Sequence, residues 1–405
     1  MKLRTVLFWI HVAVGVVVGL VVLNMSVTGM IMAFEPQIVA FAERDVGHVP
    51  PPAPDAPRLA LGALVARVRE QVPTASVTAV TVTAEPTAAV SLNLGREAGT
   101  VYVNPYNGDV LGKGSKVRDW LHDVEAWHRR LSTAPTGDAA ERRPIGRTLT
   151  GSTAVALSFM AVSGLYLWWP RTSSGQPVVL FRRGLRGRAR DFNWHNVAGL
   201  WCAGLLLVST ATGVVMSFRW ANDLVYRVAG GTPPPARGGD ARAERSNEAA
   251  VTPDLDALWT RAESQAPDFV AMTMRLPRRG STVNVSIVEA GAHPHQRSTL
   301  TLDGATAAVV KWEPFSAQSR GRRWRAWVRP VHTGEAAGLP GQMVAFTGAS
   351  GATLLVATGF ALALRRLAAW ARLLSSHSDS RNASRSARSA GARLTSGSLV
   401  DSDNR

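Results

Sequence analysis

The sequence predicts an α-helical integral membrane protein, with four transmembrane helices in two duplicated halves and with two small α+β domains. Four uncharged apolar runs support the membrane assignment, because each reaches the roughly 20 residues that a helix needs to cross hydrocarbon. Polar stretches of soluble-domain character separate the runs and supply the two extramembrane domains. The runs cover residues 5–34, 149–169, 196–218 and 341–364.

A repeat relates the first and third apolar runs. A histidine lies near the start of each run and is followed four residues later by a glycine, and each run contains a Thr-Gly dipeptide 17 and 18 residues after that histidine. Two spans with one template, each with a histidine at the same depth, predict a duplicated protein built around paired histidines. The matching residues are His11, Gly15, Thr28 and Gly29 in the first run, and His195, Gly199, Thr212 and Gly213 in the third.

The chain carries 45 Lys and Arg residues against 29 Asp and Glu, a formal net charge of +16. These cations gather beside the apolar runs, so no nucleic-acid partner is predicted. Loops that remain in the cytoplasm are enriched in Lys and Arg. The N-terminus, the loop between the second and third runs, and the C-terminus are therefore all predicted to be cytoplasmic. The cations concerned are Lys2, Arg4, Arg171, Arg182, Arg183, Arg186, Arg188, Arg190, Arg365 and Arg366.

Several function classes are excluded by missing motifs. Cys202 is the single cysteine, so the chain forms no internal disulfide, and without a C-x-x-C-H motif it attaches no haem covalently. No G-x-G-x-x-G follows a strand, so no nicotinamide or flavin domain is visible. The first run is too long for a signal-peptide core and lacks a small-x-small cleavage site before Glu35, which favours a retained anchor.

Between the first two runs, the pattern predicts a helix over 58–71, with its apolar residues on one face. Strands follow over 76–83, 88–94 and 100–104, where polar and apolar residues alternate. An amphipathic helix over 117–131 is expected to lie at the outer membrane surface, before the second run.

The second half repeats this order. A helix is predicted over 255–264, and strands over 269–276, 282–288 and 298–302. Residues 375–405 are rich in Ser and Arg and have no periodic apolar pattern, so they are expected to be disordered.

Four histidines are placed by this topology. His11 and His195 begin the first and third spans near the cytoplasmic face, whereas His128 and His332 precede the second and fourth spans near the outer face. The two faces are roughly 30 Å apart. This arrangement suits two cofactors, each held between two helices by paired imidazoles, because such ligation saturates the axial positions of haem iron and favours electron transfer. A histidine at an interface is also commonly an amphipathic anchor, but the matched pairs favour a functional role.

Some positions keep two interpretations. His122 competes with His128 for the outer position, and we prefer His128 because it is closer to the second span and flanked by Trp127 and Arg129. The glycine four residues after each inner histidine shares its helical face and would leave room for a porphyrin edge. The pair His293 and His295 lacks further ligands and is a weak metal candidate. Arg129, Arg130, Arg329 and the Arg-rich loop are candidate partners of haem propionates or, equally, of solvent and lipid headgroups.

Five further motifs lie at the span ends and in the first domain: His11-x3-Gly15 with Thr28-Gly29, Val101-Tyr102-Val103-Asn104-Pro105-Tyr106-Asn107-Gly108, Gly164-Leu165-Tyr166-Leu167-Trp168-Trp169-Pro170-Arg171, Trp194-His195-Asn196-x2-Gly199, and His332-Thr333-Gly334-Glu335. Together they resemble the bacterial PepSY-associated transmembrane helix family, which includes iron-regulated membrane proteins and ferric-siderophore reductases. The resemblance covers nearly the whole chain, to about Leu374. It implies a multi-pass protein of the bacterial inner membrane, with periplasmic PepSY-like domains and b-type haems that deliver electrons to ferric siderophores.

The sequence therefore predicts nine segments: 1–34 as the first transmembrane helix, 35–116 as the first periplasmic PepSY-like domain, 117–148 as an interfacial helix and connector, 149–169 as the second transmembrane helix, 170–193 as a cytoplasmic Arg-rich loop, 194–218 as the third transmembrane helix, 219–329 as the second PepSY-like domain, 330–366 as the outer histidine segment with the fourth transmembrane helix, and 367–405 as a cytoplasmic tail.

The predicted function is transmembrane electron transfer through two b-type haems. His11 and His195 would hold the inner haem, and His128 (or His122) and His332 the outer one. Electrons from a quinol or a donor protein would reach a periplasmic acceptor such as a ferric siderophore, and membrane lipid would surround the spans. Two alternatives remain: a non-catalytic, membrane-anchored PepSY module that binds or regulates a peptidase, and a permease for iron chelates.

Overall fold

The computed structural model describes most of the chain: residues 3–72, 76–95, 98–132, 143–169, 178–235, 254–276 and 282–397, with side chains described as far as Arg372. Contacts divide the chain into two compact units, and each is built from separate segments. The first unit comprises Met1–Ser26, Ala156–Leu207 and Gly348–Arg405, and the second comprises Val27–Val155 and Val208–Thr347.

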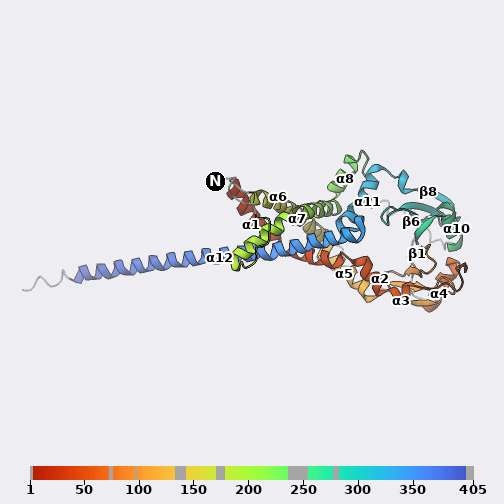
Figure 1. Ribbon diagram of the computed structural model, residues 1–405, viewed down its shortest axis with the longest axis horizontal. Helices are drawn as coiled ribbons and strands as arrows, with labels where there is room; N and C mark the ends of the chain where they lie inside the picture. Colours follow the sequence, from red (N-terminus) through yellow and green to blue (C-terminus); the bar gives the residue numbers. More distant parts are fainter. Residues whose placement is uncertain are drawn as a thin grey trace, which may run out of the picture. The chain divides into compact units, whose positions relative to one another are not determined.

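Among the described residues, four helices are long and apolar enough to cross a membrane. Most of each apolar surface is not covered by protein, which leaves it available to lipid. The prediction of a multi-pass helical membrane protein is confirmed. The four helices are α1 (Leu3–Met32), α6 (Arg143–Trp168), α7 (Gly187–Ser217) and α12 (Gly338–Gly397), which can be followed by colour in Figure 1.

The helix α12 is longer than the sequence pattern predicts. Residues 375–405 were expected to be disordered, but α12 continues as far as Gly397, and 398–405 lie outside the described residues. The sequence of α12 contains no proline after Pro340. A helix that has already formed in the span extends at little cost through Ala, Arg, Leu and Ser, since only the first turn is costly.

Short helices follow two of the spans. After α1 the chain forms α2 (Glu35–Ala42) and α3 (Arg44–Gly47), and after α7 it forms α8 (Arg219–Val228). Pro36 lies in the first turn of α2, where a missing N–H costs nothing. The sequence does not predict these helices, because each is too short to show a clear apolar period.

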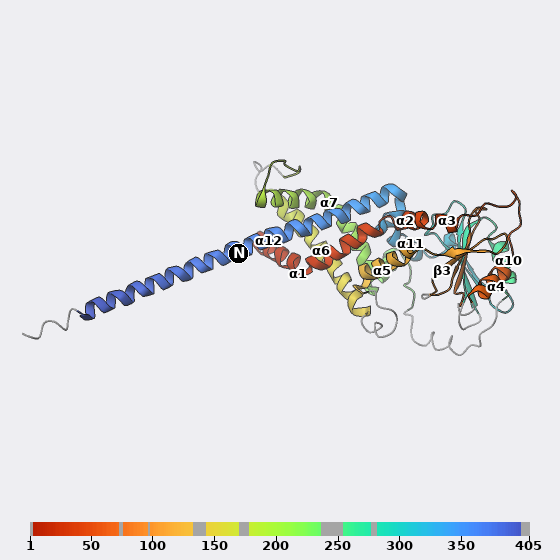
Figure 2. The ribbon, with the colours of Figure 1, turned by 90° about the horizontal axis from the view of Figure 1, so that it is seen from below.

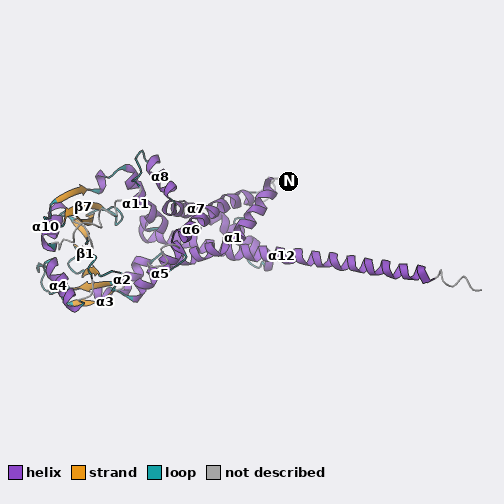
Figure 3. Ribbon diagram, turned by 180° about the vertical axis from the view of Figure 1, so that it is seen from behind, coloured by secondary structure: helices purple, strands orange, loops and turns teal. Residues whose placement is uncertain are grey.

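The strands form one eight-stranded antiparallel sheet in the second unit, shown in orange in Figure 3. Its order is β4-β3-β2-β1-β5-β6-β7-β8, so each half is a four-stranded meander and the two meanders join where β1 pairs with β5. The strands are β1 (Ala79–Thr83), β2 (Val90–Asn93), β3 (Thr100–Val103), β4 (Val110–Lys113), β5 (Phe269–Arg275), β6 (Thr282–Glu289), β7 (Ser298–Asp303) and β8 (Val309–Glu313).

This sheet corrects the expected pair of separate three-stranded domains. The two halves are continuous because β1 and β5 would otherwise each present an open row of N–H and C=O groups. The additional strands β4 and β8 bury no side chain fully, so they lack the alternation that marked the other strands.

The core of the sheet lies on one face, beneath α4 (Leu61–Gln71) and α10 (Leu255–Gln265), as Figure 2 shows. The predicted apolar face of α4 is the buried one, with the i, i+3, i+4 and i+7 spacing of an amphipathic helix. Alternate strand residues from both halves complete this single core. Its fully buried members include Leu64, Val65, Val68, Leu92, Val103, Leu258, Met272, Met274, Ile287, Leu300 and Leu302.

Two amphipathic helices follow the two meanders, α5 (Lys116–Arg130) and α11 (Arg320–Thr333). Each begins with a serine cap: the Ser115 side chain accepts from the Arg118 N–H, and the Ser319 side chain accepts from the Arg322 N–H. Sequence periodicity predicts α5 to within one residue at either end. It does not predict α11, because the five arginines and Pro330 obscure the apolar pattern.

Candidate functional site: two pairs of histidines

The first pair of histidines lies in the first unit, between α1 and α7. The ring centroids of His11 and His195 are 6.5 Å apart, and the ring planes are nearly perpendicular, at 85°. Nδ1 of His11 is hydrogen-bonded to Oγ of Ser163 on α6 at 2.9 Å. Nδ1 of His195 is hydrogen-bonded to Oγ1 of Thr358 on α12 at 3.0 Å. All four spans therefore contribute to one site.

The second pair lies in the second unit, between α5 and α11. The ring centroids of His128 and His332 are 6.2 Å apart, with an angle of 71° between the ring planes. Nδ1 of His128 is hydrogen-bonded to Oγ1 of Thr28, and Nδ1 of His332 to Oγ1 of Thr212, both at 2.9 Å. Burial lowers the pKa of His332, which favours the neutral imidazole that a metal requires.

Of the two candidates on α5, the structure brings His128, and not His122, beside His332. The His122 side chain is exposed on another face of the helix. A sequence signal for this choice exists: His128 follows its capping Ser115 by 13 residues, as His332 follows Ser319. The signal becomes visible only when the two helices are aligned from their capping serines.

Each of the four paired histidines contacts a Ser-Gly or Thr-Gly dipeptide on a neighbouring helix. The hydroxyl residue is hydrogen-bonded to Nδ1, and at His11, His195 and His332 the glycine that follows it leaves space beside the ring. A Cβ on Gly164 would lie 3.4 Å from Cε1 of His11, one on Gly359 would lie 3.4 Å from Cε1 of His195, and one on Gly213 would lie 3.7 Å from Cε1 of His332. The dipeptides are Ser163-Gly164, Thr358-Gly359, Thr28-Gly29 and Thr212-Gly213.

The glycines that are expected to leave room for a porphyrin edge, Gly15 and Gly199, lie beside side chains of neighbouring spans. A Cβ on Gly15 would lie 3.0 Å from Cε of Met160, and one on Gly199 would lie 3.7 Å from Cδ2 of Leu355. Both positions thus face neighbouring spans, and they serve helix packing.

The spacing of both pairs suits one metal ion between two imidazoles. With a metal–nitrogen distance of about 2.0 Å and a ring radius of about 1.1 Å, two rings on opposite sides of an ion have centroids about 6.2 Å apart. The observed 6.5 and 6.2 Å agree with this value. Two opposed imidazoles complete the coordination of an iron that already carries four porphyrin nitrogens. In centroid spacing, each pair therefore fits a bis-histidine haem.

The family model for the PepSY-associated TM region matches residues 8–366, which is nearly the whole chain and includes all four histidines. The chain belongs to this family. A search of the curated proteins found no match. The four spans, the duplicated halves and the paired histidines described above are thus features of a PepSY-associated TM protein.

The other predicted site residues of this PepSY-associated TM protein lie apart from the pairs. Arg129 forms an ion pair with Glu125 at 2.9 Å, and Arg329 is exposed. The rings of His293 and His295 stack 5.4 Å apart. Within the part of the chain that the structure describes, no third His, Cys, Asp or Glu joins them as a metal ligand.

In the Arg-rich loop of this PepSY-associated TM protein, two arginines surround a buried carboxylate. Asp191 lies 2.9 Å from Arg190 and 3.3 Å from Arg365. Arg171 is outside the described residues. Charge pairing thus already engages part of the cationic cluster that was proposed for propionates or headgroups.

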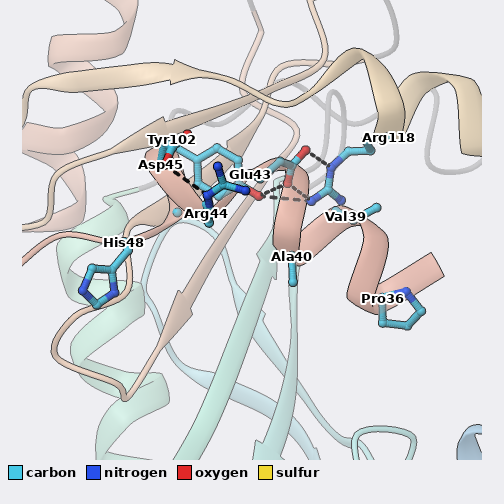
Figure 4. A pocket seen from close by; sticks show the side chains of 10 residues that line it. Pro36, Val39, Ala40, Glu43, Arg44, Asp45, His48, Tyr102 and Arg118 are labelled. Atoms are coloured by element: carbon cyan, nitrogen blue, oxygen red, sulfur yellow. Dashed lines mark hydrogen bonds and ion pairs between the residues drawn. The ribbon is translucent and has the colours of Figure 1, made fainter. Parts of the chain in front are cut away.

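A buried carboxylate, Glu43, anchors the start of α5 and was not anticipated. It borders a cavity of about 710 Å³, and Figure 4 shows it between Tyr102 and Arg118. Its oxygens accept hydrogen bonds from the Tyr102 hydroxyl at 2.7 Å, from the Ser115 N–H at 2.8 Å and from Arg118 Nε at 2.8 Å. The network joins the segment after α2, the strand β3 and the helix that carries His128.

The electrostatics of this network follow from its hydrogen bonds. Burial alone would raise the pKa of Glu43, but the bonds from Arg118, Tyr102 and Ser115 outweigh it and lower that pKa to about 2. Burial and the bond to Glu43 raise the pKa of Tyr102 to about 12. The carboxylate therefore stays charged and bonded at neutral pH.

Proposed function

We propose that the protein transfers electrons across the bacterial inner membrane through two b-type haems, to a periplasmic acceptor such as a ferric siderophore. His11 and His195 would hold one haem, and His128 and His332 the other. The observation that supports this proposal is the presence of two imidazole pairs with ring centroids 6.5 and 6.2 Å apart. Both values match the separation expected across one metal ion.

The haems would supply a reversible one-electron couple, and with a histidine pair holding each one, the iron would be suited to electron transfer rather than to binding a small gas. The protein's own part is to orient the imidazoles and to keep water from the sites. Reduction of a ferric chelate to its ferrous form takes one electron. A quinol donor would release two electrons and two protons, and so would serve two such acceptors, whereas a donor protein would deliver electrons singly.

The proposed orientation places both termini and the loop between α6 and α7 in the cytoplasm, and the sheet in the periplasm. It is supported by the arginines that flank the spans, including the Arg4 side chain, which donates a hydrogen bond to the Trp169 carbonyl at 3.0 Å. The spans then bring the inner histidine pair towards the donor side, and the outer pair towards the acceptor side.

A reduced-minus-oxidised visible spectrum of the purified full-length protein, with haem quantified per chain, tests this function. We expect low-spin b-type bands and about two haems per chain. His332→Ala and His11→Ala should each remove one haem, whereas His122→Ala, a matched control on α5, should retain both. Unchanged haem content in His332→Ala would contradict the assignment.

Haem-free protein, after expression with ample haem, would favour the alternatives. Retained binding of a peptidase would then support the membrane-anchored PepSY module. Uptake of an iron chelate by reconstituted vesicles without a reductant would support the permease.

A further inference from the structure

A hydroxyl group contacts Nδ1 of every one of the four paired histidines. The distances lie between 2.9 and 3.0 Å, which is normal for a hydrogen bond. Each hydroxyl comes from a different span, and each belongs to a Ser-Gly or Thr-Gly dipeptide. The hydroxyl residues are Thr28, Ser163, Thr212 and Thr358.

The direction of these hydrogen bonds follows from where each hydroxyl sends its single proton. The Thr358 hydroxyl donates to the Leu354 carbonyl at 2.7 Å. The Thr212 hydroxyl donates to the Val208 carbonyl at 2.8 Å, which is the same i−4 arrangement. Since a hydroxyl has one proton and two lone pairs, each oxygen then accepts from the imidazole. The histidine Nδ1 must therefore carry a proton.

A backbone carbonyl reinforces this arrangement at the two second-half histidines. Nδ1 of His332 lies 3.0 Å from the Ser209 carbonyl oxygen, and His195 makes a backbone hydrogen bond to Leu355. Both carbonyls belong to the residue three positions before the hydroxyl partner. Because a carbonyl only accepts, the bond from His332 to Ser209 requires the Nδ1–H tautomer. The lone pair is then on Nε2, the nitrogen that would ligate a metal.

At His11 the hydroxyl partner shows the same direction. The Ser163 hydroxyl donates to the Met160 carbonyl at 3.3 Å, which leaves its oxygen to accept from Nδ1. Thr28 holds the matching place for His128 in the repeat. Hydroxyls suit this position in a span, because their protons are satisfied by their own helix, whereas a carboxylate partner would be costly in hydrocarbon.

We infer that Thr28, Ser163, Thr212 and Thr358 are positioning residues, which fix each histidine in its Nδ1–H tautomer and strengthen Nε2 as a metal ligand. The inference rests on the proposed function for the bound group, a haem, but it assigns roles to four residues that the function itself does not name. A hydrogen bond from Nδ1 raises the basicity of the ligand and fixes the ring orientation. A more basic axial ligand stabilises ferric iron and so lowers the reduction potential.

The test replaces one hydroxyl by a methyl group of the same shape. In Thr212→Val the outer haem should dissociate about 10-fold to 100-fold faster, the usual cost of losing an outer-shell partner. Its midpoint potential should rise, and the inner haem of the same molecule should keep its potential. Thr358→Val should give the reverse pattern. Thr353→Val is the matched control, because Thr353 makes the same i−4 bond on α12, to the Ala349 carbonyl, and is not one of the four hydroxyl residues that contact a paired histidine.

Conservative variants separate the hydrogen bond from packing. Thr212→Ser and Thr358→Ser should restore both potentials, since the hydroxyl is retained and only a methyl group is lost. If the valine variants do not accumulate, Ser163→Ala removes a single oxygen and should raise the potential of the inner haem alone. Wild-type protein with two haems and valine variants with unchanged potentials and release rates would overturn the inference. Wild-type protein without haem would instead overturn the proposed function.

Discussion

The imidazole of His11 lies directly against the backbone of α6, because Gly164 has no side chain there. Gly164→Leu would place an isobutyl group where a Cβ already lies 3.4 Å from the ring. We expect the ring to be displaced and the haem content to fall from about two to about one per chain, since metal ligands tolerate only small shifts. Gly204→Leu on α7 is the control, because nothing lies within 4 Å of its Cβ position. A Gly164→Leu protein with full haem content would contradict this prediction.

Glu43 makes the stability of the second unit depend on pH. Its pKa is about 2 in the folded state and 4.5 when unperturbed. A depressed carboxyl pKa contributes stability that is complete above 4.5 and is lost as the pH falls from 4.5 towards 2. In detergent, thermal unfolding should therefore shift to lower temperature between pH 5 and pH 3 by more in the wild type than in Glu43→Gln.

The control for Glu43 is Glu125→Gln, which removes only an exposed i, i+4 pair with Arg129. Such pairs contribute about 0.3–0.5 kcal/mol at most, so the pH profile should match the wild type. Identical pH profiles for the wild type and Glu43→Gln would show that the network does not stabilise the fold.

Among individual residues, the sequence predicted the paired histidines but not the side chains that contact them. His11 and His195 were found because the repeat placed them at one depth of two spans. The sequence did not predict the contacts of Ser163 and Thr358 with the histidines. A hydroxyl in a span can bond a carbonyl of its own helix, so its presence in the sequence does not indicate a second partner. Which helix faces each ring depends on how the helices rotate about their axes, and local periodicity does not determine this.

Among the elements, α5 and α11 position the outer histidines, and each depends on a serine at its start. Ser319→Ala removes the acceptor for the Arg322 N–H and should cost about 1 kcal/mol of unfolding free energy. Thermal or chemical unfolding followed by circular dichroism measures this. Ser264→Ala near the end of α10, where the hydroxyl only meets its own helix, should stay within about 0.5 kcal/mol of the wild type. Equal losses in both variants would argue against a capping role.

Element boundaries were predicted well where one face of an element is buried. The helix α4 and the strands β1, β2 and β3 alternate between a buried side and an open side, and sequence periodicity records this difference. The strands β4 and β8 lie at the two edges of the sheet and bury no side chain fully, so their sequences lack this alternation. The sequence did not predict helices α2 and α8, because each lies directly after a long apolar run.

For the whole molecule, the decisive contact is the pairing of β1 with β5. Thr81 is opposite Thr273, with hydroxyl oxygens 3.1 Å apart on the open face of the sheet. In a Cys202→Ser background, Thr81→Cys with Thr273→Cys should form a disulfide on mild oxidation, because directly opposed residues fall within bonding distance. Mobility on a gel before and after reduction measures the cross-link.

The control pairs Thr81→Cys with Ser286→Cys. Ser286 is opposite Thr273 on the next strand, so it lies about 10 Å from Thr81, beyond the reach of a disulfide. A cross-link in the control, or none in the first pair, would exclude this register. The sequence did not predict the join, since alternation identifies the apolar face of a strand but not the neighbour that it pairs with across 190 residues.

The register of this join has an evolutionary consequence. Val80 pairs with Leu92 as Met274 pairs with Val285, so Val80 and Met274 occupy equivalent places in the two meanders, and they lie opposite each other at the centre of the sheet. A strand that meets its own equivalent in this way has the isologous geometry of a two-fold symmetric dimer. A chain of half this length would carry one histidine of each pair and an open β1 edge, and an identical subunit would supply both missing parts. The protein therefore has the architecture of a homodimer whose two subunits became one polypeptide, free to diverge from one another.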